Sequence, residues 1–365
     1  MAGVYISYPF CAQKCTYCNF ASGVFPKELE RVYLEALRAE IGDHDWQWRP
    51  DTVYLGGGTP SQMELADLEP LLAWIPGGSW REATLEAAPG GITAGKAAAW
   101  AKSGINRVSL GVQSFVQREL ARTGRKHTAE IVEREIGVLR TNGISNINVD
   151  LIAGLPGQTI ASWRESLLWI EKLNPPHVSV YMLEVDEDSR LGSEVLLNGK
   201  RYGAPDVPRD EQIAGFYELA VEELARWGIL RYEISNFARP GFESLHNLKY
   251  WRLEPYAGFG ADAHSFDRCW RYQNVEKADD YVRHIGDRGS ARVGKTAANL
   301  QEEKFFVGLR LAEGIRPAAN EWSFYAQPIE RFLAAGLLER SGDALRLTNR
   351  GVLVSNEVFA EFLTA

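Results

Sequence analysis

The chain has 365 residues, of which 45% are hydrophobic and 24% charged, as is ordinary for a soluble globular protein. This length suffices for one large domain and a smaller one. A net charge of −8 argues against general nucleic-acid binding, which needs a basic surface.

The N-terminal sequence MAGVYISYPFC lacks a basic start followed by an apolar core, so we expect no secretory signal. No run reaches the roughly 20 apolar residues that a membrane span needs. Three of the four cysteines, Cys11, Cys15 and Cys18, lie within eight residues, and Cys269 is far away. We therefore expect a cytoplasmic, reduced protein whose clustered thiols bind metal rather than form disulfides.

Short β-branched runs alternate with helical patterns in the first half of the chain. The predicted strands are Val4–Tyr8, Thr52–Leu55, Thr84–Ala87, Arg107–Gly111, Asn146–Ile152 and His177–Tyr181. Helices are predicted over Lys27–Ile41, Gln62–Trp74 and Ala129–Asn142. This alternation indicates parallel βαβ units, and six of them predict an α/β fold with a partial (β/α)6-type barrel. Such barrels place their sites where the strands end.

The alternation of strand and helix patterns ends after the sixth predicted strand. Glu184–Val207 is polar and loop-rich, and Asp210–Trp227 is typical of a helix. We expect a core barrel over residues 1–230, a connecting segment over 231–296 and a mainly helical C-terminal region over 297–365. Helices followed by a short hairpin make this last region winged-helix-like.

The spacing Cys11-x3-Cys15-x2-Cys18 follows the first strand directly. A structural zinc site needs four ligands, and nothing nearby supplies the fourth, since the nearest histidine is His44. Three thiolates suit a 4Fe-4S cubane instead, because its fourth iron can stay open to a small molecule. A zinc loop without redox chemistry and unliganded surface thiols remain the alternatives.

Other strand ends also carry polar or glycine-rich sequence. The second strand ends in Gly56-Gly57-Gly58-Thr59-Pro60, which lacks the Lys-Ser/Thr of a phosphate loop. Glycines there let backbone groups approach a ligand closely. Later strand ends and loops supply Glu86, Gln113, Arg125 and Asp150, each of which could also be an ordinary surface or ion-pair residue.

CxxxCxxC with Tyr17 before the last cysteine resembles the signature of the radical S-adenosylmethionine superfamily. The motifs YISYPFCAQKCTYCNF, LGGGTPS, EAAPG, RVSLGVQSF, TGRKH and NVDLIAGLPGQT are similar to the oxygen-independent coproporphyrinogen III oxidase group. This resemblance covers about Val4 to Ser265. It implies a 4Fe-4S cluster on the three clustered cysteines, with S-adenosylmethionine on the open iron.

The resemblance also implies roles for individual residues. It places Tyr5 and Tyr17 near the cofactor, and Gly57, Gly58 and Thr59 against the methionine ammonium group. Arg125 is expected to pair with the carboxylate, to which its planar fork is suited. Glu86, Gln113 and Asp150 are expected to orient the methionine and ribose parts.

The group has two branches, which differ in function. True oxidases carry a further cysteine two residues after the third, where this chain has Phe20. The haem chaperone branch, of HemW type, has phenylalanine there and an HNxxYW string, which matches His246–Trp251. The resemblance implies His246 as a haem iron ligand, with His264 and Cys269 as rivals. His127 is interpreted as a loop residue.

The resulting hypothesis is a haem chaperone that binds a 4Fe-4S cluster, S-adenosylmethionine and haem. Its expected partners are acceptor haem proteins, respiratory and membrane-associated, so that it would act peripherally at the membrane. A homodimer is expected by analogy only. The alternatives are an oxygen-independent coproporphyrinogen III oxidase and a zinc-loop binding module.

Overall fold

The computed structural model describes residues 2–363, so the first residue of the expected 1–230 region and the last two of 297–365 lie outside the described residues. Its centre is a curved sheet with the strand order β12-β11-β10-β9-β1-β2-β3-β4-β5-β6-β8-β7. Between residues 2 and 363 no pairing joins β12 to β7, so the barrel is open. The α/β class and the partial barrel are confirmed.

Six neighbouring parallel strands form the core of the sheet. They are β1 (Ala2–Tyr8), β2 (Pro50–Gly57), β3 (Glu82–Ala87), β4 (Arg107–Gln113), β5 (Asn146–Ala153) and β6 (His177–Met182). All six predicted strands are thus found. Their residues alternate: in β4, Val108 and Leu110 are fully buried in the outer hydrophobic core, while Ser109 contacts Asp150 inside the barrel.

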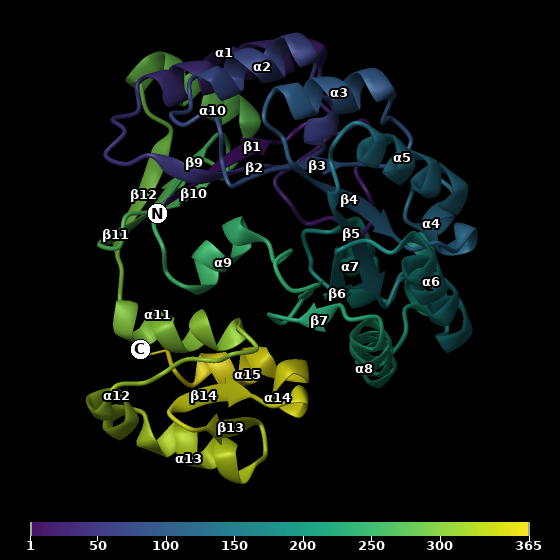
Figure 1. The fold of residues 1–365 in the computed structure, drawn as a ribbon, viewed down its shortest axis with the longest axis vertical. Coiled ribbons are helices and arrows are strands. Elements are labelled where there is room, and N and C mark those ends of the chain that lie inside the picture. Colours follow the sequence, from purple (N-terminus) through teal and green to yellow (C-terminus); the bar gives the residue numbers. More distant parts are fainter. Residues whose placement is uncertain (1, 364–365) are drawn as a thin grey trace.

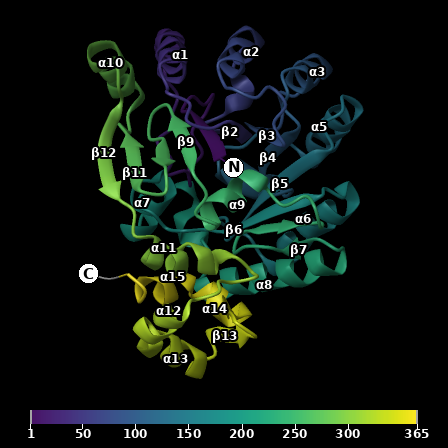
Figure 2. The same cartoon turned by 60° about the vertical axis from the view of Figure 1, so that its left-hand side comes forward.

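Helices cover the outer face of the sheet (Figures 1 and 2). They are α1 (Lys27–Gly42), α2 (Leu65–Ala73), α3 (Ala94–Lys102), α4 (Gln117–Arg122), α5 (Ala129–Thr141), α6 (Ile160–Leu173), α8 (Asp210–Arg226) and α10 (Ala278–Arg288). Helix α7 (Arg190–Leu196) lies beside the cysteine loop instead. The helix predicted over Gln62–Trp74 is shorter, because Glu64 is extended and separates a 3-10 turn at Pro60–Gln62 from α2. The loop-rich segment contains α7, whose N-terminal amide is capped by Ser189.

Later strands widen the sheet at both edges. They are β7 (Leu230–Arg231), β8 (Asn236–Ala238), β9 (Tyr256–Phe259), β10 (His264–Phe266), β11 (Trp270–Asn274) and β12 (Arg292–Ala297). Strand β9 pairs in parallel with β1, and β10 to β12 continue antiparallel. The short helix α9 (Leu245–Trp251) lies inside the curve of the sheet (Figure 2).

The C-terminal region forms a separate layer next to α9 (Figure 1). It consists of α11 (Leu300–Phe306), α12 (Ala319–Phe324), α13 (Ala326–Ala334), the hairpin β13 (Leu338–Ser341) and β14 (Ala344–Leu347), α14 (Asn349–Leu353) and α15 (Ser355–Ala360). An antiparallel bridge from Glu233 to Leu311 attaches it to the barrel. No helix within residues 2–363 combines the length and apolar character needed to cross a bilayer.

Candidate functional site at the barrel mouth

The three clustered cysteines lie on an irregular loop directly after β1, at the carboxyl end of the parallel strands. Their side chains are half-buried, and none of them forms a disulfide. The amide of Cys11 donates to the carbonyl of Gly23 over 2.8 Å, which closes the loop. Burial raises the pKa of the Cys11 thiol, whose sulfur accepts a 3.7 Å hydrogen bond from Thr59. The predicted strand–loop context of the cysteines is therefore found.

The donor set suits a cluster better than a single ion. Among residues 2–363 no three His, Cys, Asp or Glu side chains gather closely enough to hold one metal ion. A cubane does not require this, because its three thiolates bind three different irons. Three half-buried thiols on one loop therefore fit a 4Fe-4S cluster.

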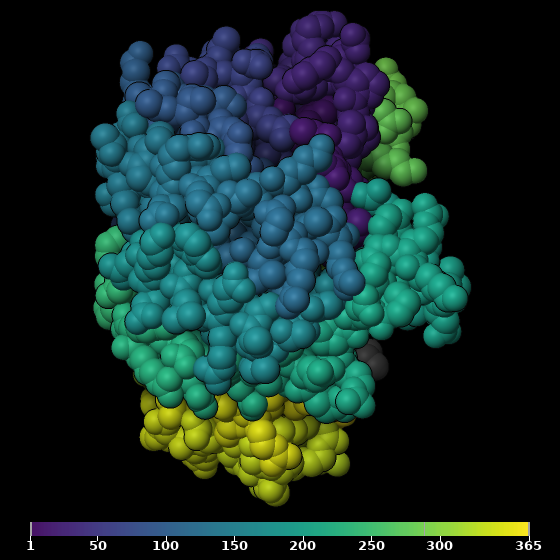
Figure 3. All heavy atoms as spheres, turned by 90° about the vertical axis from the view of Figure 1, so that its right-hand side faces the viewer, coloured from purple at the N-terminus to yellow at the C-terminus, as the bar shows by residue number. Residues whose placement is uncertain are grey.

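The cysteine loop is also held by the segment around α7. Asn19 donates to Asp186 over 2.7 Å, and the amide of Leu191 donates to the carbonyl of Thr16 over 2.8 Å. Figure 3 shows the α7 segment standing out from the surface near the N-terminal part of the chain. Phe20 is 64% exposed on this loop.

Arg125 and Tyr17 connect the cysteine loop to β4. Arg125 Nη2 donates to the Tyr17 hydroxyl over 3.2 Å, and Nη1 donates to the Gly111 carbonyl over 2.8 Å. Arg125 Nε is buried without a hydrogen-bond partner. This orphaned donor fits a further ligand such as a carboxylate, because buried donors are normally paired.

The glycine turn packs directly on the cysteine loop. The amides of Gly58 and Thr59 donate to the carbonyls of Tyr8 and Phe10 over 2.7 and 2.9 Å. A side chain at position 58 would bring its Cβ within 2.6 Å of the Phe10 oxygen. Gly57 has φ of 108°, a conformation that favours glycine. The turn therefore needs glycine at both positions.

Glu86 lies inside the barrel beside this turn. Its carboxylate accepts hydrogen bonds from the Tyr54 hydroxyl (2.8 Å) and the Gly57 amide (3.1 Å). Burial, with repulsion from Asp150 as a lesser cause, raises the pKa of Glu86 to about 7. The ring of Tyr5 stacks on Tyr54 with centroids 6.1 Å apart. These contacts bring Tyr5, Gly57 and Glu86 together around the Tyr54 ring.

Asp150 and Gln113 complete the inner wall. Asp150 accepts hydrogen bonds from Ser109 (3.1 Å) and Asn148 (2.6 Å), and burial raises its pKa. Gln113 adopts φ of 72° at an irregularity in the β4–β5 pairing and is 8% exposed. Its amide and the Arg125 guanidinium flank the same glycine, Gly111.

His246 lies at the opposite, amino end of the barrel strands. It is 1% exposed, and both ring nitrogens have partners: Nδ1 lies 2.9 Å from the Thr52 hydroxyl and Nε2 lies 2.8 Å from the Tyr250 hydroxyl. Burial, together with the charge of Lys249, lowers the pKa of His246 to about 3. The histidine is therefore neutral and fully hydrogen-bonded.

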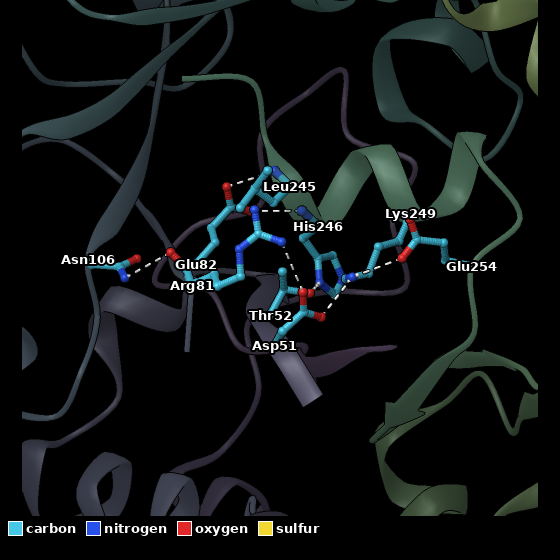
Figure 4. A network of polar contacts seen from close by, with 9 residues as sticks. All are labelled: Asp51, Thr52, Arg81, Glu82, Asn106, Leu245, His246, Lys249 and Glu254. Carbon is cyan, nitrogen blue, oxygen red and sulfur yellow. Dashed lines mark hydrogen bonds and ion pairs between the residues drawn. The ribbon is translucent and has the colours of Figure 1, made fainter. Parts of the chain in front are cut away.

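Helix α9, which carries His246, is fixed by residues that the sequence reasoning missed (Figure 4). The Glu82 carboxylate accepts from the amides of Leu245 (2.8 Å) and His246 (2.9 Å). Lys249, 4% exposed, makes ion pairs with Asp51 (2.8 Å) and Glu254 (3.2 Å). The alternation Glu82, Thr84, Glu86 along β3 was the available signal for an inward-facing carboxylate.

The rival residues lie elsewhere. His264 is exposed on β10, and Cys269 is exposed on the turn before β11. His127 is 4% exposed, and burial, assisted by the Arg125 charge, lowers its pKa to about 4. It follows Arg125 in the loop before α5, as expected of a loop residue.

Comparisons with known proteins agree with the motifs. The family described as "Radical SAM superfamily" matches residues 5–170, and that described as "HemN C-terminal domain" matches 296–354. The chain is 34% identical to "Heme chaperone HemW" of Bacillus subtilis, covering 100% of this chain and 99% of the relative. It is also 34% identical to "Heme chaperone HemW" of Escherichia coli, covering 99% and 97%. The solved Escherichia coli coproporphyrinogen III oxidase (HemN) superposes with a TM-score of 0.85 at 21% identity, over 99% of this chain and 89% of that one, which shows the shared fold.

Proposed function

This chain belongs to the HemW family of the radical S-adenosylmethionine superfamily, and we propose that it binds haem and delivers it to acceptor haem proteins. The observation that carries this proposal is the full-length similarity to haem chaperones, at 34% identity. Phe20 supports it, because the oxidase branch was expected to have a cysteine at this position.

Cys11, Cys15 and Cys18 would hold the 4Fe-4S cluster, as three half-buried thiols on one loop. The cluster, when bound, supplies one-electron chemistry at the open iron. The chain's own contribution is to orient S-adenosylmethionine there. Thr59 donates to the Cys11 sulfur and would tune its basicity, as outer hydrogen bonds do for cluster ligands.

The S-adenosylmethionine contacts follow from the groups that face the mouth. The unpaired Nε and the fork of Arg125 would pair with the carboxylate. The turn at Gly57, Gly58 and Thr59 would bind the ammonium group, and the nearby Glu86 would add negative charge when ionised. Gln113 and Asp150 would contact the methionine and ribose, with Tyr5 and Tyr17 packing beside them.

His246 would provide the axial ligand to haem iron, with Tyr250 and Trp251 of the same helix as aromatic neighbours. The proposed acceptors are respiratory haem proteins at the membrane, and a homodimer is part of the proposal by analogy. Sedimentation of cluster-loaded and cluster-free protein tests the dimer; a monomer in both states would remove it.

Metal analysis tests the cluster. After anaerobic reconstitution, the wild type should hold close to four irons and four sulfides, Cys15→Ala should hold far fewer, and the exposed control Cys269→Ala should match the wild type. Zinc without iron and sulfide would instead favour the zinc-loop alternative.

Haem transfer tests the function itself. Haem-loaded protein should restore the spectrum of a haem-free, membrane-bound respiratory cytochrome faster than free haem at the same concentration. Haem that stays on the protein would contradict delivery. Anaerobic decarboxylation of coproporphyrinogen III by the cluster-loaded protein would return the oxidase reading to favour.

A further inference from the structure

Helix α9 closes the amino end of the barrel. The parallel register places Gly3, Thr52 and Glu82 side by side on β1, β2 and β3, and α9 sits on these three residues. The glycine turn of the cofactor mouth begins at Gly57 on the same strand as Thr52, roughly 16 Å further along at about 3.3 Å per residue. His246 is therefore remote from the cluster loop, at the other end of the lumen.

The closed position leaves no coordination site on His246. An axial ligand needs a ring nitrogen with a free lone pair, and both nitrogens are engaged by Thr52 and Tyr250. A porphyrin also needs open space on that side of the ring. Here the imidazole is only 1% exposed, and Gly3 packs so closely that a Cβ there would lie 3.0 Å from its Cε1.

The contacts that hold α9 come almost entirely from outside the helix. Glu82 accepts hydrogen bonds from the Ser244 hydroxyl (3.1 Å) and from the amides of Leu245 and His246, while the Asn247 amide donates to the Ser244 oxygen (3.3 Å). Lys249 anchors the other end on Asp51 of β2. Tyr250 also packs on Tyr256 (4.7 Å between ring centroids), and Arg310 lies over the Trp251 ring (4.5 Å), so these contacts would open together with the Glu82 cap if the helix moved.

The backbone on either side of α9 supplies turning points. Gly241 before the helix has φ of 87°, and Leu253 after it has φ of 53°, which is unusual for a leucine. Residues with such backbone angles mark sharp turns in the chain. These two turns bound the segment that carries α9, and the paired strands β8 and β9 lie outside it.

We propose that α9 is a displaceable plug that gates haem binding, and that iron reaches His246 only after the Thr52 contact and the Glu82 cap have opened. This inference rests on the proposed function, because it presupposes that His246 ligates haem. Displacement would release Nδ1 from Thr52, and rotation of the Tyr250 side chain would release Nε2. Only the minor open state then binds, so the apparent haem affinity is reduced by the open fraction.

Thr52→Val tests the gate, since valine keeps the shape of threonine and removes the hydroxyl. In the closed state valine leaves a buried ring nitrogen of His246 without a partner, which shifts the equilibrium between the closed and open positions of α9 toward the open one by about tenfold. Haem association, followed by stopped-flow absorbance, should become about tenfold faster than in the wild type. The control Thr93→Ala removes the N-cap of α3, away from α9, and should leave the rate unchanged.

Hydrogen exchange gives a second readout that needs no variant. The amides of Leu245 and His246 should be protected in haem-free protein and should lose protection when haem is added. An unchanged association rate in Thr52→Val, or amides that stay protected while haem is bound, would overturn the gate. These results differ from failure of the proposed function itself, in which the wild type binds no haem or His246→Ala binds it equally well.

Discussion

Arg125 donates a 3.2 Å hydrogen bond from Nη2 to the hydroxyl of Tyr17, which lies immediately before the third cysteine. A second hydrogen bond holds the same guanidinium on the Gly111 carbonyl of β4. The cysteine loop and the fourth strand are thus joined through one side chain before any ligand arrives. This preorganisation lowers the cost of ordering the mouth when S-adenosylmethionine binds.

Arg125→Lys should weaken S-adenosylmethionine binding by about tenfold to a hundredfold, because lysine lacks the planar fork that pairs with a carboxylate. Equilibrium dialysis with the reconstituted protein measures this, and iron content should stay unchanged. Arg140→Lys, on α5 away from the mouth, serves as the control. Equal affinities in the two variants would remove Arg125 from the cofactor site.

Gly58→Ala should cost about 2–4 kcal/mol of unfolding free energy and lower the iron content, since its Cβ would lie 2.6 Å from the Phe10 oxygen and 2.8 Å from the Pro9 carbonyl carbon. Both neighbours are backbone atoms of the cysteine loop and cannot rotate away. The matched control is Gly137→Ala on α5, where a Cβ meets nothing within 4 Å. Urea unfolding that ranks the two variants equally would contradict the packing described.

The pH dependence of stability should carry a contribution from Glu86. Its pKa rises from 4.5 to about 7 on folding. Between these two pH values the folded state therefore keeps a proton on Glu86 that the unfolded state has lost. Stability gained from this group is present below pH 4.5 and is lost as the pH rises to 7, by roughly 3 kcal/mol. In urea unfolding Glu86→Gln should lack this loss, and the exposed Glu171→Gln should keep it. Parallel profiles for wild type and Glu86→Gln would refute the assignment.

His246 should change the pH dependence of stability in the opposite direction to Glu86. Its pKa falls from 6.5 to about 3 on folding, so below pH 6.5 the unfolded state binds a proton that the folded state refuses. Between pH 7.5 and 5 the wild type should lose about 2 kcal/mol relative to His246→Gln. Urea unfolding at the two pH values measures the difference. An equal acid loss in both proteins would show that α9 does not bury this histidine.

The sequence predicts the strands and the cysteine loop well, because both depend on local pattern. Each parallel strand is a short apolar run, and the cysteine spacing falls directly after the first of them. The extension of the sheet beyond its six central strands could not be predicted. Tyr256 pairs with Gly3, and nothing in either segment encodes a partner some 250 residues away. Long-range pairing of short strands leaves no periodic signal.

The candidate site also contains residues that the sequence predicts and contacts that it does not. Gly57 contacts Glu86, and Arg125 contacts Gly111 near the end of β4, so these motif residues lie at strand ends. The burial of His246 could not be predicted, since its partners Thr52 and Glu82 belong to strands that are distant in sequence. A histidine in an aromatic string has the same appearance whether it is exposed to ligands or sealed inside a barrel.

The most direct test of the central claim is a haem titration of wild type, His246→Ala and His264→Ala, followed by the Soret absorbance. The wild type and His264→Ala should bind haem stoichiometrically, and His246→Ala should lose the Soret band position of coordinated haem. Stoichiometric binding that survives His246→Ala with an unchanged spectrum would contradict the claim, and absence of binding in all three would refute a haem carrier altogether.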